Sequence, residues 1–220
     1  MKNLTVDTII EGMVKITLNA QSLVEEAEIL YENKYYARTY TLSHIAREEM
    51  SKLYMLYKVG IEIIAGKEFN HKKLEKRLRN HKSKIQFFSI PVTITGLNSS
   101  YIKGINKRKN DSLYVGYEEE IFKSPKENIT KYIAKRTLDL ATYTIIKLTN
   151  VHNLIQTLDE WSKAPKDEFN KVFGNIIYKT NEELIEDIDS EALMKSMKFI
   201  EDELNDKFYQ SIKEENNNDS

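Results

Sequence analysis

The sequence predicts an all-α protein whose long helices pack as an antiparallel bundle. Only 7 Gly and 3 Pro occur in 220 residues, and so few turn-forming residues argue against a turn-rich β sandwich. Apolar residues recur at alternating spacings of four and three, the period of a helix that buries one face. A chain of this length can also bury a substantial core. We therefore expect a helical bundle that carries a long irregular insertion and extra C-terminal helices.

The first two helices are the clearest in the sequence. One apolar stripe runs from Ile9 to Leu30, and a second runs from Leu42 to Ile63. Between them, the pair Asn33-Lys34 is expected to form a tight turn. Gly66 is expected to end the second helix. Two long helices joined by such a short link must pack antiparallel.

The following segments are less regular. A third helix is predicted over residues 70–88 and is expected to end or kink near Pro91, because proline disrupts helices. Residues 96–124 show no helical period, so we predict an irregular loop between the third and fourth helices. The apolar segment 113–117 (Leu-Tyr-Val-Gly-Tyr) within it is expected to fold back onto the bundle.

Pro125 is predicted to open a fourth long helix that ends near Trp161, since proline is favoured in the first turn. Pro165 is predicted to start a shorter helix, and a final helix is expected over residues 190–210. The predicted organisation is a bundle over 1–162, with core motifs at 20–130, then C-terminal helices over 163–212 packed on that bundle, and a disordered tail over 213–220.

Composition excludes several classes of site. The chain has no Cys, so disulfides and thiolate metal sites are absent. We find no Gly-rich phosphate loop, EF-hand-like loop or His-rich pattern, and therefore expect no metal and no cofactor. No apolar run approaches the roughly 18 residues that span a bilayer, and the N-terminus lacks the apolar core of a signal peptide. We expect a cytoplasmic protein without membrane attachment.

The net charge of −1 hides a gradient along the chain. Residues 71–110 contain eleven Lys or Arg and one acid, a net charge of +10. Residues 181–220 contain thirteen acids and four bases, a net charge of −9. This asymmetry is typical of a surface for polyanions with an acidic segment that shields it or maintains solubility. Two solvated helix faces are the alternative explanation.

Polar residues on the apolar stripes mark the candidate site. Glu49 and Lys52 interrupt the stripe of the second helix, and His81 interrupts that of the third, followed by Lys84. Because a buried charge is costly unless it is paired, we expect Glu49, Lys52 and His81 to share one polar cluster. Two residues on an adjoining strip are expected to extend it: His44 and Glu48. Such a cluster either holds a His that acts as acid or base beside a phosphate or is purely structural.

Four short blocks of the chain resemble the AbiV family of abortive infection proteins. Residues 48–52 (Glu-Glu-Met-Ser-Lys) are similar to the family's Glu-Glu-x-x-Lys signature. Residues 27–37 resemble the segment that precedes it, residues 81–84 (His-Lys-Ser-Lys) resemble a His-Lys-x-Lys element, and residues 113–117 resemble a Leu-Tyr-Val-Asp segment. Two positions depart from the pattern. Ser51 replaces a Gly, which a helix tolerates, and Gly116 replaces an Asp, whose role is then absent or moved to Glu118 or nearby.

The resemblance implies a HEPN-like helical bundle, a homodimer, and an action during phage infection that stops viral protein production. Many HEPN proteins are ribonucleases that use an Arg and a His separated by a short spacer. Arg38 and His44 match that spacing. They lie on the second helix, however, whereas the motif normally lies on a later one, so we treat this match as accidental.

We therefore predict a phage-defence effector that blocks phage protein production by acting on RNA or the translation apparatus. As a metal-independent ribonuclease it uses His81 as acid or base, with Glu49 orienting His81 and Lys52 contacting phosphate. Further phosphate-binding residues are expected at Lys82, Lys84, Lys107 and Arg108, and supporting residues at Glu48, His44 and Tyr114.

Two alternatives remain open. One is a non-enzymatic helical module that recognises a phage or host protein, in which the Glu/Lys/His cluster is purely structural. The other is a helical scaffold with no defence role. The expected partners are a second copy of the chain, an RNA or ribosome-associated partner, and a phage protein as activator.

Overall fold

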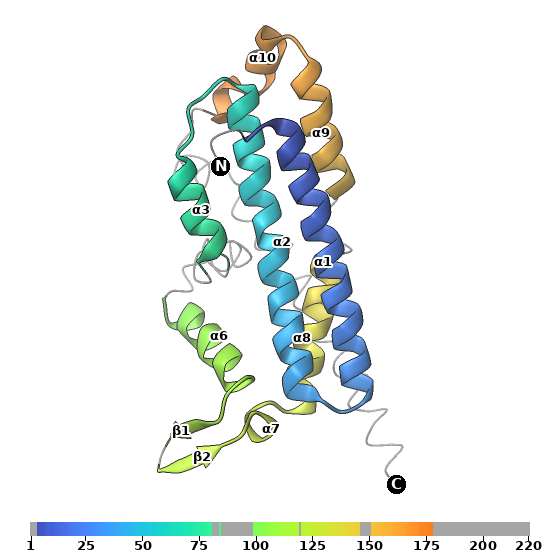
Figure 1. The fold of residues 1–220 in the computed structure, drawn as a ribbon, viewed down its shortest axis with the longest axis vertical. Coiled ribbons are helices and arrows are strands. Elements are labelled where there is room, and N and C mark those ends of the chain that lie inside the picture. The colour runs from blue at the N-terminus through green and yellow to red at the C-terminus, as the bar shows by residue number, and fades with distance from the viewer. Residues whose placement is uncertain (1–3, 81–83, 85–98, 119, 146–150, 178–220) are drawn as a thin grey trace, which may run out of the picture. The chain divides into compact units, whose positions relative to one another are not determined.

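The computed structural model describes residues 4–80, 84, 99–118, 120–145 and 151–177, and these ranges are almost entirely helical (Figure 1). All of them belong to one compact unit, residues 1–177. The predicted all-α fold is confirmed. The final helix predicted over 190–210 and the tail over 213–220 lie outside the described residues. None of the described helices is long and apolar enough to cross a bilayer.

Two long helices, α1 (Val6–Glu32) and α2 (Tyr36–Ile64), are joined by the predicted tight turn. Asn33 caps α1, since its Nδ2 donates to the carbonyl oxygen of Ile29 at 2.8 Å. Lys34 follows with a φ of 64° and reverses the chain. After α2, Gly66 has a φ of 73°, a left-handed conformation that glycine adopts without strain and that commonly follows a helix end.

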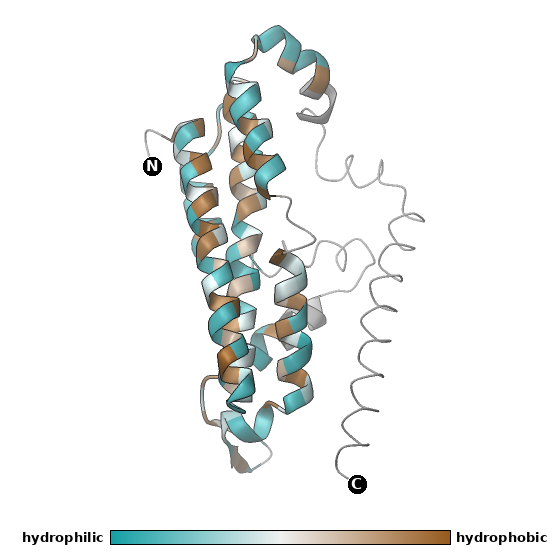
Figure 2. Cartoon of the chain, turned by 90° about the vertical axis from the view of Figure 1, so that its right-hand side faces the viewer, coloured by the Kyte–Doolittle hydropathy of each residue, from teal (hydrophilic) through white to brown (hydrophobic). Residues whose placement is uncertain are grey.

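Helix α2 contacts every other helix in the described part of the chain. Figure 2 shows apolar residues recurring along α1 and α2. The main core cluster joins both helices to Leu158 of α9 (Val151–Lys163) and Phe169 of α10 (Lys166–Ile177). A second cluster includes α8 (Lys131–Tyr143) and contains mostly small side chains, which let the helices approach closely: Val24, Ala27, Ala46, Leu138 and Ala141.

Residues 96–124 were predicted to be irregular, and this prediction is wrong for the part that the structure describes. It contains helix α6 (Ser99–Asp111) and a hairpin of β1 (Gly116–Glu118) and β2 (Ile121–Lys123). The strands are antiparallel and pair Tyr117 with Phe122. The C-terminal end of α6 packs on α2, where the hydroxyl oxygens of Ser112 and Thr41 lie 2.8 Å apart and buried. Segment 113–117 does not fold back, because Tyr114, Val115 and Tyr117 are exposed.

Two predicted helices have different bounds. Helix α3 covers His71–Arg79, with Asn70 and Asn80 as its caps. Of the rest of its predicted span, the structure describes only Lys84. The fourth helix is divided, because Pro125 opens only a single turn, α7 (Pro125–Asn128). Thr130 then starts α8 as a new N-cap, its Oγ1 accepting from the backbone N–H of Ile133 at 3.3 Å. A side-chain cap of this kind satisfies a helix terminus and starts a separate helix.

A substitution at Phe169 tests how much the packing of α10 contributes to the stability of the bundle. Its side chain is fully buried and meets the Trp161 ring edge-on, with ring centroids 5.6 Å apart. We expect Phe169→Ala to lower the free energy of unfolding by about 3–5 kcal/mol, the usual cost of such a cavity. Val172→Ala on the exposed side of the same helix is expected to change it by less than about 0.5 kcal/mol. Chemical denaturation measures both; equal effects would contradict the packing of α10.

Candidate functional site

A buried polar cluster lies on α2, and Glu48 is its centre. His44 Nε2 lies 3.1 Å from Glu48 Oε1, and Lys84 Nζ lies 3.1 Å from Glu48 Oε2. The side chains of His44, Glu48 and Lys84 are 1%, 2% and 8% exposed. Both carboxylate oxygens therefore have a nitrogen partner, which compensates for removing the charge of Glu48 from water.

The sequence placed Glu49 at the centre of this cluster, but the buried carboxylate is its neighbour Glu48. Glu49 forms the expected ion pair with Lys52 on the same helix. These two side chains remain 15% and 21% exposed. Consecutive residues point about 100° apart around a helix. The side chain of Glu48 therefore lies in the buried interior, whereas that of Glu49 lies on a partly exposed side of α2. His81 and Lys82 lie outside the described residues, and their predicted roles stay predictions.

The surroundings of His44 favour its neutral form. Burial is the main cause that lowers its pKa below the usual 6.5, and the positive charges of Arg47 and Lys109 add to this effect. The hydrogen bond and negative charge of Glu48 oppose it. Because an ionised carboxylate only accepts hydrogen bonds, Nε2 of His44 carries the proton and donates to Glu48. The ring also stacks on Tyr40, with centroids 6.1 Å apart.

The C-terminal end of α6 completes the surroundings of the cluster. Lys109 is 9% exposed, and its positive charge helps to lower the pKa of His44. Ser112 contacts Thr41 one turn before His44 on α2. Sequence reasoning missed both residues, although Lys109 directly follows the predicted phosphate ligands Lys107 and Arg108. It missed them because this segment was predicted to have no helical period.

The cluster has groups for proton transfer, but its three side chains are almost fully buried. A general acid or base must come within hydrogen-bonding reach of the reacting atom. Side chains that are almost fully covered by the protein do not meet that condition. Among the described residues, no group of three His, Cys, Asp or Glu side chains could hold a metal ion. The arrangement of His44, Glu48 and Lys84 is that of a network that holds α2 and the residue at position 84 together.

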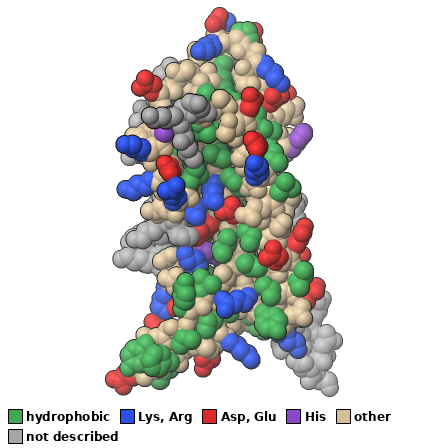
Figure 3. All heavy atoms as spheres, in the orientation of Figure 1, with side chains coloured by type: hydrophobic (Ala, Val, Ile, Leu, Met, Phe, Trp, Pro, Cys, Tyr) green, Lys and Arg blue, Asp and Glu red, His purple; other side chains and the backbone are tan. Residues whose placement is uncertain are grey.

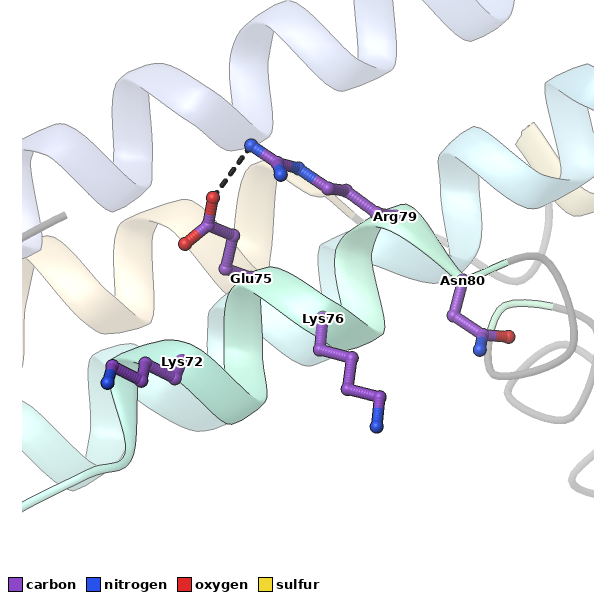
Figure 4. Close-up of a pocket in the computed structure, with 5 residues that line it drawn as sticks. All are labelled: Lys72, Glu75, Lys76, Arg79 and Asn80. Atoms are coloured by element: carbon purple, nitrogen blue, oxygen red, sulfur yellow. Dashed lines mark ion pairs between the residues drawn. The ribbon is translucent and has the colours of Figure 1, made fainter.

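Exposed basic residues lie on α3, on the same side of α2 as α6 (Figure 1). An open surface hollow is lined by five residues of this region: Lys72, Glu75, Lys76, Arg79 and Asn80. Figure 4 shows Glu75 paired with Arg79, at 2.7 Å, while Lys72 and Lys76 point away from that pair. Figure 3 shows Lys and Arg side chains gathered over α3. This surface has the charge that attracts phosphate groups.

The other predicted phosphate ligands lie in different surroundings. Lys107 is exposed and bonds Asp111 at 2.9 Å and Glu118 at 3.2 Å, contacts that raise its pKa. Arg108 beside it is also exposed. Tyr114, a predicted supporting residue, is 66% exposed near the hairpin and is not part of the buried cluster.

The other histidine patterns do not form a site with this cluster. Arg38 is exposed whereas His44 is buried, so the two side chains that match the ribonuclease spacing lie on different faces of α2. His152 is exposed on α9 and is not part of the buried cluster.

Comparison with known proteins identifies one family. A family model of the HEPN type, described as AbiV, matches residues 8–146. The match includes α1, α2, α3, α6, the hairpin and α8. No curated protein and no solved structure gives a significant match.

Removing one partner of the buried ion pair is expected to be costly. Lys84→Met leaves Glu48 without its cation, and we expect the free energy of unfolding to fall by about 3–5 kcal/mol. Adding Glu48→Gln should recover much of that loss, because the uncompensated charge disappears. Lys52→Met is the control: its partner Glu49 is partly exposed, so we expect a loss of less than about 1 kcal/mol. Urea denaturation of the three variants measures these values, and equal losses for both lysines would contradict the central place of Glu48.

The lowered pKa of His44 predicts a dependence of stability on pH. The unfolded chain takes up a proton near pH 6.5, while the folded His44 takes it up only at lower pH. The stabilisation is therefore complete above pH 6.5 and is lost as the pH falls toward the folded pKa, by at most about 1.4 kcal/mol per pH unit. His44→Gln should make the slope of the unfolding free energy against pH shallower, by at most the contribution of one proton. Denaturation of the wild type and of this variant between pH 5 and 7.5 tests this, and an unchanged slope in His44→Gln refutes the assignment.

Proposed function

This chain belongs to the AbiV family of HEPN proteins, and from that premise we propose that it is an abortive-infection effector that blocks phage protein production. Membership of this family supports the role in phage defence. We further propose that the protein acts by binding RNA or an RNA-containing part of the translation apparatus. The observation that carries this mechanism is the exposed basic surface of α3.

Three features of that surface support RNA as the ligand. Lys72, Lys76 and Arg79 come from successive turns of one short helix and line the same hollow. The hollow is open, so a polymer can lie across it without threading into a cavity. Lysine and arginine side chains bind phosphates without reading sequence. An effector that stops translation broadly needs no more specific contact than this.

The buried cluster supports binding more than catalysis. His44, Glu48 and Lys84 are covered, so in our proposal they keep the basic surface in place beside α2. The ribonuclease version depends on the more accessible Glu49–Lys52 pair together with His81. Total bacterial RNA incubated with the protein in the presence of EDTA distinguishes the two versions. Cutting that His81→Ala abolishes supports the enzyme, and RNA that stays intact although bound supports the binding module.

Charge reversal on α3 tests the binding mechanism. We expect the double variant Lys72→Glu/Lys76→Glu to bind RNA at least about tenfold more weakly. The slope of log affinity against log salt should become shallower by about 1.4, since each phosphate contact on a single strand contributes roughly 0.7. Fluorescence anisotropy with a labelled single-stranded RNA measures both. Phage plating on bacteria that express the variant should show reduced protection.

The matched control reverses two exposed lysines outside the basic surface, Lys163 and Lys171. Lys163→Glu/Lys171→Glu changes the net charge equally, so it should leave most of the affinity and the protection intact. RNA affinity that falls equally in the two double variants would show a non-specific charge effect and reject the α3 surface. Protection that survives the loss of RNA binding would favour the alternative, a module that recognises a phage or host protein.

A further inference from the structure

One buried cation at the contact between α2 and α6 has no anion beside it. Lys109 of α6 is 9% exposed. Two acids that are close to it in the sequence, Asp111 and Glu118, both bond Lys107 instead. Within the described residues, the Lys109 ammonium group forms no ion pair and no hydrogen bond. Because a buried charge without a partner is costly, this position calls for an anion.

The packing of α6 on α2 places Lys109 beside the buried cluster. Figure 1 shows that α2 rises from the turn at its lower end, whereas α6 descends toward the hairpin. The hydroxyl oxygens of Ser112 and Thr41 lie 2.8 Å apart across this contact. One helical turn further from the hairpin, α6 carries Lys109 and α2 carries His44. The charge of Lys109 accordingly helps to lower the pKa of His44, and the two side chains border one polar region between the helices.

Positive charge exceeds negative charge around this polar region. The carboxylate of Glu48 carries one negative charge, which Lys84 balances at 3.1 Å. The surroundings of His44 favour its neutral form. Lys109 therefore adds a positive charge that no described carboxylate of the region offsets, and the charge of Arg47 adds to the same field.

Lys109 also lies near the surface, although it is largely covered. Its neighbours Arg108 and Asn110 on α6 are exposed, and Lys109 itself keeps some contact with solvent. A small anionic group can therefore approach the ammonium group from the side of α6. A polymer backbone needs a more open surface, such as the hollow on α3.

We propose that Lys109 anchors a binding site for a terminal phosphate group, as found in inorganic phosphate, in a nucleoside monophosphate or at a phosphorylated RNA end. Such a group carries a charge of about −1.5 to −2 at pH 7 and offers three acceptor oxygens, and a lysine ammonium has three donors for them. A phosphodiester within RNA carries only one negative charge and a nucleoside on each side, so it fits this covered position less well. The site does not depend on the proposed function, because none of its residues belongs to α3.

Urea denaturation of the full-length chain in phosphate, compared with chloride of equal ionic strength, tests the site. A ligand that binds only the folded state stabilises it by mass action, so phosphate should raise the urea midpoint of the wild type. Lys109→Met should weaken phosphate binding by about tenfold or more, because a charge-assisted hydrogen bond is lost. Lys109→Arg keeps the charge and should retain most of the affinity.

The matched control is Lys163→Met, which removes the same charge from an exposed position on α9. It should respond to phosphate as the wild type does. Phosphate also stabilises proteins generally as a salt, and this effect is common to all variants. The difference between Lys109→Met and Lys163→Met therefore measures the site itself, and equal responses in these two variants overturn the proposal.

The stability of Lys109→Met without phosphate is a second test. The substitution removes a buried charge that has no anionic partner, so the variant should unfold at the same urea concentration as the wild type or at a higher one. A large loss of stability, of the kind expected for Lys84→Met, would show that the protein itself balances the charge of Lys109. That result would overturn the proposal even if phosphate binding were weakened.

Two further probes identify the source of the phosphate. One is a nucleoside 5′-monophosphate, and the other is a short RNA with either a 5′ phosphate or a 5′ hydroxyl. Binding of the monophosphate that Lys109→Met weakens assigns the site to a small molecule. A preference for the 5′-phosphorylated RNA that disappears in Lys109→Met assigns it to an RNA end. A wild-type chain that binds neither probe and does not respond to inorganic phosphate refutes the site.

Discussion

The carboxylate of Glu48 is the constraint around which the middle of the molecule is arranged. It lies almost fully covered on α2, the helix that every other described helix contacts. Water is excluded there, so its charge needs protein partners for both oxygens. His44 supplies one from the same helix, but Lys84 must come from beyond α3. The ion pair therefore links two parts of the chain that apolar packing alone does not specify, and this link lies next to the basic surface of α3.

The end of α6 adds positive charge to the surroundings of this cluster. Glu48 can balance one full positive charge, and Lys84 supplies it. Lys109 and Arg47 add further positive charge nearby, so a protonated His44 would have too many cations around it. The neutral imidazole is the consequence. The buried contact between Thr41 and Ser112 joins the end of α6 to α2, and the exposed hairpin continues from there.

Local signals predicted much of the fold, and tertiary packing decided the rest. The turn at Lys34 and the stop at Gly66 follow from nearby sequence and were predicted. The sequence did not predict that Glu48 is buried in place of Glu49, because an argument from periodicity assumes that a helix has one inward face. Helix α2 is covered on several sides, so polar and apolar residues share its buried surface. Helix α6 has no apolar stripe of its own, and the strands of the hairpin are three residues long, too short to give a periodic signal. Lys84 was named as a candidate, but its partner depends on which carboxylate the fold buries.

The positions of these groups limit which chemistry the protein can perform. Catalysis by His44 or Glu48 requires a rearrangement that exposes them, because their side chains are only 1% and 2% exposed. A rearrangement that removes Lys84 from the carboxylate leaves a buried charge unpaired, which is costly, and so needs a partner whose binding compensates for it. The Glu49–Lys52 pair and the α3 surface need no such rearrangement, since both are already accessible to solvent. In the function that we propose, the protein therefore binds first with its exposed basic residues, and the buried residues contribute to stability.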